Sequence, residues 1–169
     1  MGDKQRLYLA VYPSGIQDDP ELWFAYGFLI GPKKEYGSPV PGYVVEPGQT
    51  KIGNTVIPIW RYGTVETQDV SARPYLLARI LIAKITDFSR LTTLLRTVQL
   101  VQGGSPATMS MIWARQALNA IKHDGRCVGT SVLDWARVDE SARKYADVKN
   151  QLFPKPTYCL ITDRELVGW

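Results

Sequence analysis

The order of two hydrophobic patterns along the chain is the feature that most limits its fold. The first half holds apolar runs with β-type alternation, separated by turns rich in Pro and Gly, and we expect strands over residues 6–12, 22–31, 43–46, 56–63 and 76–85. Helical spacing follows, over residues 88–98, from about residue 107 to 124, and through a charged stretch that ends near residue 151. Strands followed by helices, instead of alternating βαβ units, predict an α+β fold with helices packed on an antiparallel sheet.

Local signals indicate where these elements end. Pro58, inside the fourth strand, predicts a sheet edge or a bulge because proline cannot donate a ladder hydrogen bond. Asp87 is a candidate N-cap, and Gly125 supplies the left-handed residue that ends the second helix. Ser131, with Asp134 three residues later, resembles a capping box for the third helix.

The composition fits a single domain over residues 1–169 and excludes several kinds of partner. The 20 Lys and Arg against 16 Asp and Glu give a net charge of +4, and they are scattered, which argues against a nucleic-acid partner. The apolar run Leu22–Ile30 is far shorter than the roughly 20 residues that cross a bilayer, so we expect no membrane span. Two cysteines without an apolar leader favour a cytoplasmic protein, and the oligomeric state stays open.

Metal and covalent chemistry find little support in the sequence. One His and two Cys cannot supply a zinc site, and we expect no metal and no cofactor. His123 and Cys127 are four residues apart, but Gly125 separates them, so a structural role is favoured over a nucleophile pair. The acidic pairs Asp18–Asp19 and Asp139–Glu140 are typical of a turn and of a first helical turn.

Five segments together resemble a large family of uncharacterised fungal proteins. They are RLYLAVYPSG, FLIGPK, LLARILIAKITDFSRLTTLLRTVQLVQ, WARQALNAIKHDG and GTSVLDWARVDESARKYADVKNQ, and they span a core of residues 6–151, with residues 152–169 as a C-terminal extension that carries one strand near 158–162. The resemblance implies a circularly permuted, papain-like fold of the NlpC type, similar in layout to lecithin:retinol acyltransferase-like cysteine hydrolases. In that family a His-Trp pair precedes the GPK strand, and an Asn-Cys pair heads the later helix.

This chain departs from the family at the reactive positions. Ala25 and Tyr26 stand where the family has His-Trp, and Met109 and Ser110 stand where it has Asn-Cys. Ser110 keeps a hydroxyl, but a serine without a neighbouring base is a poor nucleophile. The resemblance therefore implies a former hydrolase cleft that has lost both its nucleophile and its base.

Our main prediction is a pocket that binds a largely apolar small molecule without covalent chemistry. It would promote a cyclisation or isomerisation in fungal secondary metabolism, because holding a flexible substrate in a reactive conformation needs no nucleophile. Tyr26, Ser110 and Glu46 are the candidate catalytic groups. The candidate substrate-binding residues are mostly aromatic or Met side chains, which suit pocket walls: Ala25, Phe28, Trp60, Tyr62, Met109, Met111 and Trp113.

Two alternatives remain open. Most of these aromatic residues could belong to the core, with Phe24, Tyr26 and Phe28 on one strand face and Trp23 opposite. The second alternative for function is a noncatalytic pseudo-hydrolase that acts through protein–protein contacts, for which the cationic residues Arg137, Arg143 and Lys144 and the terminal Trp169 are candidates. A hydrolase that uses Ser110 or Cys127 is the least favoured interpretation.

Overall fold

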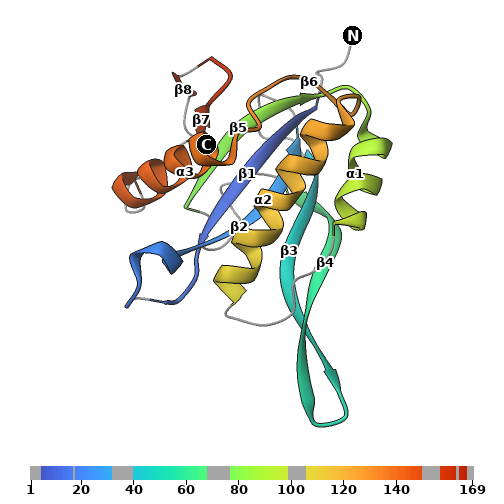
Figure 1. Ribbon diagram of the computed structural model, residues 1–169, viewed down its shortest axis with the longest axis vertical. Coiled ribbons are helices and arrows are strands. Elements are labelled where there is room, and N and C mark those ends of the chain that lie inside the picture. Colours follow the sequence, from blue (N-terminus) through green and yellow to red (C-terminus); the bar gives the residue numbers. More distant parts are fainter. Residues whose placement is uncertain are drawn as a thin grey trace.

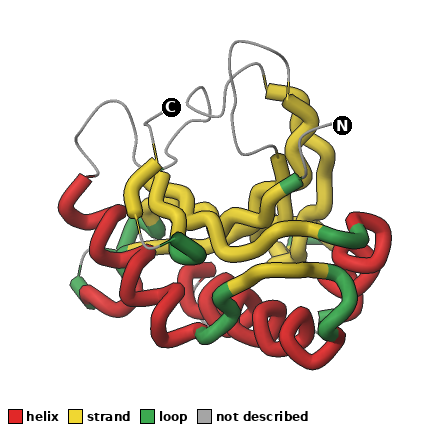
Figure 2. Tube along the Cα trace, turned by 90° about the horizontal axis from the view of Figure 1, so that it is seen from above, coloured by secondary structure: helices red, strands yellow, loops and turns green. Residues whose placement is uncertain are grey.

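The computed structural model describes residues 5–16, 18–31, 40–67, 77–98, 106–149, 157–162 and 164–166. It confirms an α+β fold in which the helices pack on one face of a largely antiparallel sheet (Figures 1 and 2). The sheet order is β4-β3-β2-β1-β5-β7-β8, with β6 beside β5. The elements are β1 (Arg6–Pro13), η1 (Pro20–Leu22), β2 (Phe24–Gly31), β3 (Val40–Ile52), β4 (Thr55–Thr67), β5 (Ala78–Ile85), α1 (Phe88–Thr97), α2 (Pro106–Asp124), β6 (Val128–Ser131), α3 (Trp135–Lys149), β7 (Thr157–Cys159) and β8 (Arg164–Leu166).

The central strands β1, β2 and β5 divide their side chains between two faces. Leu7 and Leu9 of β1 lie in the core under the helices, whereas Tyr8 belongs to a second apolar cluster on the opposite face. Side chains alternate in this way because the strand repeat is two residues. The same alternation puts Phe24, Tyr26 and Phe28 in the helix-side core, as predicted.

Most predicted strands form, but the third and fourth are much longer than expected. β3 and β4 have 13 residues each and pair continuously from Val40 with Thr67 to Ile52 with Thr55. Gly53, at a φ of 62°, turns the chain between them in the left-handed region that glycine tolerates. Among the described strands β4 is an edge, which confirms the prediction from Pro58.

The helix ends follow two of the three predicted signals. The Asp87 side chain accepts a hydrogen bond from the Arg90 amide at 3.0 Å, and Gly125 follows α2 at a φ of 67°. The prediction of a capping box at Ser131 is wrong, because Ser131 is the last residue of the short strand β6. Asp134 instead precedes α3 directly, and its carboxylate accepts a hydrogen bond from the Arg137 amide at 3.4 Å.

The sheet opens between β2 and β3. These strands pair only at Phe28 with Val45, Leu29 with Val44 and Ile30 with Tyr43, although both strands continue beyond Phe28 and Val45. Residues 46–61 therefore form a two-stranded ribbon that makes no ladder pair with β2. Figure 1 shows this ribbon projecting past the other strands.

Candidate functional site

Ser110 connects α2 to the edge of β2 at the point where the sheet opens. Its Oγ accepts a hydrogen bond from the Tyr26 amide at 3.1 Å and donates one to the Ala107 carbonyl at 2.9 Å. Ser110 is fully buried, and Tyr26 is 1% exposed. Both hydrogen-bonding functions of the hydroxyl are thus engaged within the protein.

The end of the β2–β3 ladder at Phe28 explains why the Tyr26 amide needs this partner, and two prolines indicate the direction of the backbone groups. Pro47 pairs with Trp60 and Pro58 pairs with Gln49, and a proline has no N–H to give to the opposite strand. The backbone groups at these pairs therefore point away from the β3–β4 ladder. Because the direction of the backbone N–H and C=O groups alternates along a strand, those of Val45, two residues before Pro47, also point away from β4 and toward β2. Val45 lies opposite Phe28, so the backbone groups of Phe28 point toward β3. The Tyr26 amide, two residues earlier on β2, points to the same side, but β3 no longer pairs with β2 there. Ser110 takes the hydrogen bond that β3 would otherwise accept.

The Tyr26 hydroxyl reaches a second polar group on α3. It donates to Asp139 Oδ1 at 2.7 Å, and Arg143 Nε contacts both oxygens of that carboxylate at 3.1 Å. Burial, followed in importance by the charge of Asp139, raises the pKa of Tyr26 well above its ordinary value. The hydroxyl therefore keeps its proton and acts as a fixed donor.

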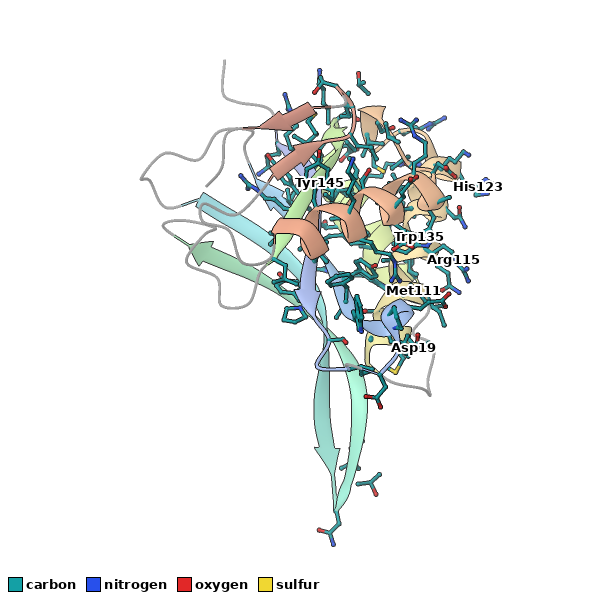
Figure 3. All side chains as sticks on the ribbon, turned by 90° about the vertical axis from the view of Figure 1, so that its left-hand side faces the viewer. Asp19, Met111, Arg115, His123, Trp135 and Tyr145 are labelled. Atoms are coloured by element: carbon teal, nitrogen blue, oxygen red, sulfur yellow. The ribbon has the colours of Figure 1, made fainter. Side chains whose placement is uncertain are left out.

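Arg143 ties this network to the loop between β1 and β2. Its Nη1 donates to the Pro20 carbonyl at 3.0 Å, and its Nη2 donates to the Glu21 carbonyl at 2.7 Å and lies 3.8 Å from Met111 Sδ. Figure 3 shows Met111 and Trp135 on this side of the molecule. One guanidinium thus joins η1, α2 and α3 around Tyr26.

Aromatic and Met side chains surround these polar contacts. The rings of Phe28 and Trp113 meet edge to face with centroids 5.3 Å apart, and those of Tyr26 and Trp135 meet with centroids 5.6 Å apart. Met109 is 4% exposed, so it belongs to the core, whereas Met111 is half-buried. The structure therefore brings together five of the predicted residues on β2 and α2: Tyr26, Phe28, Met109, Ser110 and Trp113.

Three predicted residues lie on β3 and β4 at or beyond the end of the β2–β3 ladder, where the structure gives their backbone positions. Tyr62 pairs with Val45, and Trp60 pairs with Pro47. By strand alternation these two positions share the sheet face of Phe28, whereas Glu46, which pairs with Arg61, lies on the opposite face. The structure therefore does not bring Glu46 to Tyr26 and Ser110.

Ala25 also lies apart from this group. It pairs with Tyr12 in the regular β1–β2 ladder, which puts it on the sheet face opposite Tyr26. The resemblance assigns histidine to the Ala25 position, and that position does not face Ser110. A histidine–cysteine pair is therefore not supported at these two positions.

A separate polar cluster lies where α1 meets the end of α2. Arg90 Nε donates to the two oxygens of Asp124 at 2.8 and 3.0 Å, and the amides of Arg126 and Cys127 each donate to this carboxylate at 3.1 Å. The Arg90 hydrogen bond is the main cause that holds the pKa of Asp124 well below its usual range. Burial, followed by the hydrogen bond to Asp124, raises the pKa of Cys127 to about 11, so the thiol is protonated and unreactive at neutral pH. The structural interpretation of Cys127 is therefore the better supported one.

Asp139, Arg143 and Trp135 are the site residues that the sequence analysis did not select for this role. Asp139 and Arg143 are four residues apart, a spacing at which a carboxylate and a guanidinium meet on a helix surface. That spacing predicts the ion pair. It does not predict Tyr26 as the third member, because Tyr26 and Asp139 are 113 positions apart in the chain.

Within the described residues there is no group of three or more His, Cys, Asp or Glu side chains that could hold a metal ion. No described helix is long and apolar enough to cross a membrane.

The fold and this site define an α+β protein in which a buried serine joins a helix to an open strand edge. The chain belongs to a family described as a family of unknown function, DUF6914, whose model matches residues 4–167. No curated protein and no solved structure matches the chain.

Proposed function

We propose that this protein binds a small molecule noncovalently where the sheet opens between β2 and β3. The observation that carries the proposal is the end of the β2–β3 ladder at Phe28 and Val45, while both strands continue. Ser110 closes the β2 edge there, so α2 provides the neighbouring wall. We expect the ligand to lie against the sheet at this interruption, beside the apolar side chains of β2 and α2.

The residues around this opening favour a mostly apolar ligand. Phe28, Met109 and Trp113 are buried on its helix side, and the positions of Trp60 and Tyr62 share the face of Phe28. The phase set by the prolines directs the backbone groups of Gln49 and Lys51 toward the open side of β3, where they can bond polar atoms of the ligand. Tyr26 and Ser110 hold the wall in place, since their polar atoms already have protein partners.

Any reaction in this site rests on orientation of the bound molecule. A cyclisation or isomerisation suits such a site, because a fixed near-reactive conformation lowers the barrier without a nucleophile. The closeness of the first turns of α2 to β2 supports the resemblance to permuted NlpC-type hydrolases, whereas the position of Ala25 does not. Cys127 and Cys159 are buried free thiols, as suits a protein that works in the reduced cytoplasm.

Native mass spectrometry of the purified full chain, followed by denaturing extraction, tests the proposal. We expect a bound apolar molecule that Trp60→Ala removes and that Trp23→Ala, at a residue 38% exposed near η1, does not. Absence of any bound molecule, or its retention in both Trp60→Ala and Tyr62→Ala, would contradict the site. Ligand binding and turnover that are unchanged in Tyr26→Phe and Ser110→Ala would remove these two residues from the mechanism.

A second candidate is a noncatalytic protein that binds a protein partner. The observation that favours it is the engagement of the Tyr26 and Ser110 polar atoms within the protein, together with exposed Trp23 and exposed Arg137 and Lys144 on α3. Trp169, also considered for this role, lies outside the described residues. A copurifying protein that is lost in Trp23→Ala and kept in Trp60→Ala would favour this candidate over the small-molecule site.

A further inference from the structure

We infer that β4 is a dimerisation strand, and that two copies of this chain pair their β4 edges antiparallel about Gly63 to form one continuous sheet. The inference goes beyond the proposed ligand site: it uses the outer backbone edge of β4 and not the opening between β2 and β3, although Trp60 and Tyr62 belong to both.

The length of the edge is the first argument. β4 is the terminal strand in the order of the described sheet, and it has 13 residues, more than twice the roughly 5–6 of an average strand. The outer edge of such a strand carries a row of N–H and C=O groups that can pair with another strand. Proteins usually protect such exposed edges against pairing, for example with proline or charged residues, unless the edge binds another strand.

The prolines show which part of the edge is blunted. Pro58 and its ladder partner Gln49 point their backbone groups away from each other. Because this direction alternates along a strand, the N–H and C=O groups of all even-numbered residues of β4 point to the outer edge. Pro58 removes one outward donor in the projecting ribbon, and Pro47 does the same on the other edge of the ribbon. Residues 60–66 contain no proline, and their outward positions are Trp60, Tyr62, Thr64 and Glu66.

One symmetric register uses this whole stretch. In a two-fold antiparallel pair one residue must lie opposite its own copy, and placing Gly63 there sets Tyr62 against Thr64 of the partner subunit and Trp60 against Glu66 of the partner subunit. These outward positions then exchange about eight backbone hydrogen bonds. Gly63 falls at a non-hydrogen-bonded pair, where the two backbones come closest and where a glycine within a strand is expected.

The charges in this register are compatible with a second copy as the occupant. Arg61 lies opposite Val65 of the partner subunit, and Glu66 lies opposite Trp60 of the partner subunit. No like charges stand directly opposite each other, an arrangement that would destabilise the pair. A strand that is compatible with itself in a two-fold register favours a homodimer over an unrelated extended peptide, and two-fold dimers are the commonest oligomers.

Sedimentation equilibrium of the full chain is the first test. We expect a mass near twice the 19.0 kDa of one chain, and a return to one chain mass in Thr64→Pro, which removes an outward donor without touching the β3–β4 ladder. Val56→Pro is the matched control: it is also an outward position of β4 but lies outside the paired stretch, so the dimer should persist. A monomeric wild type at tens of micromolar protein, or a dimer that survives Thr64→Pro, would overturn the inference.

A covalent test covers the case in which Thr64→Pro fails to fold. In Gly63→Cys the two copies would bring their Cα atoms to about 4.5 Å, which is within the range that a disulfide spans. Oxidation should give a covalent dimer in Gly63→Cys and none in the wild type, whose two cysteines are buried. A Gly63→Cys protein that stays monomeric under oxidation would contradict the register.

Discussion

Replacing Ser110 with Ala should destabilise the protein by removing the buried hydroxyl that accepts a hydrogen bond from the Tyr26 amide. The hydroxyl lies at 3.1 Å from that amide and is fully buried, so water cannot replace it without entering the core. A buried donor left without a partner costs about 1–3 kcal/mol. For a chain of this size each kcal/mol lowers the melting temperature by roughly 2–4 °C, so the midpoint should fall by about 2–12 °C.

Urea denaturation and amide hydrogen exchange together test this expectation. The Tyr26 amide should exchange faster in Ser110→Ala, because its hydrogen bond to the side chain is lost. Ser110→Cys should fall between the wild type and Ser110→Ala, because a thiol is a weak acceptor. Ser89→Ala, at an exposed serine near the start of α1, is the control and should change stability little. If Ser110→Ala keeps its stability within about 0.5 kcal/mol and the Tyr26 amide stays protected, Ser110 does not replace β3.

Three further results are expected from the polar contacts. Tyr26→Phe should lower the free energy of unfolding by about 0.5–1.5 kcal/mol near neutral pH. Because the pKa of Tyr26 is raised in the folded state, the wild type should also lose stability as the pH rises above about 10. Urea denaturation at pH 8–11 should show a smaller loss of stability in Tyr26→Phe than in the wild type. Arg143→Gln should loosen the contact between α3 and η1, so the Leu22 amide should exchange faster while global stability stays unchanged. Equal exchange rates of this amide in the wild type and the variant would show that the guanidinium does not hold η1 in place. The pKa of the Asp124 carboxyl is lowered in the folded state, so this group stabilises the protein above its ordinary pKa of 3.8 and less as the pH falls. Asp124→Asn should therefore lose less stability than the wild type below about pH 4. Parallel curves of stability against pH for the two proteins would contradict this expectation.

The fold class and several boundaries followed from short-range signals. The N-cap at Asp87 and the glycine after α2 depend on neighbours a few residues away, and the structure confirms both. The capping box at Ser131 failed because the same residue types also end a strand, and the sequence offered no sign that β6 would pair with β5. β3 and β4 extend well beyond the predicted strands, because Pro and Gly, which locally indicate turns, lie inside these two long strands.

The candidate site was only partly accessible to sequence reasoning. The family resemblance pointed to Tyr26 and Ser110, and the structure joins them, although they are 84 positions apart. The prediction of both residues as candidate catalytic groups does not include their partners in the fold, which are Ala107 for the Ser110 hydroxyl and Asp139 for the Tyr26 hydroxyl. Ala25 joined this group through the family resemblance alone, whereas strand alternation puts both Ala25 and Glu46 on the face opposite Tyr26.

The sequence by itself determined the central strands and the helices, because alternation, helical spacing, caps and the missing donor of Pro58 act within a few residues or one ladder pair. Only the tertiary structure decided where β3 leaves β2 and what replaces it. That choice depends on the register of β2 with β3 and on the packing of α2 over β2, both of which join residues far apart in the chain. The Tyr26 amide lacks a strand partner only where the β2–β3 ladder has ended, so the role of Ser110 follows from the assembled sheet and not from its place in the sequence.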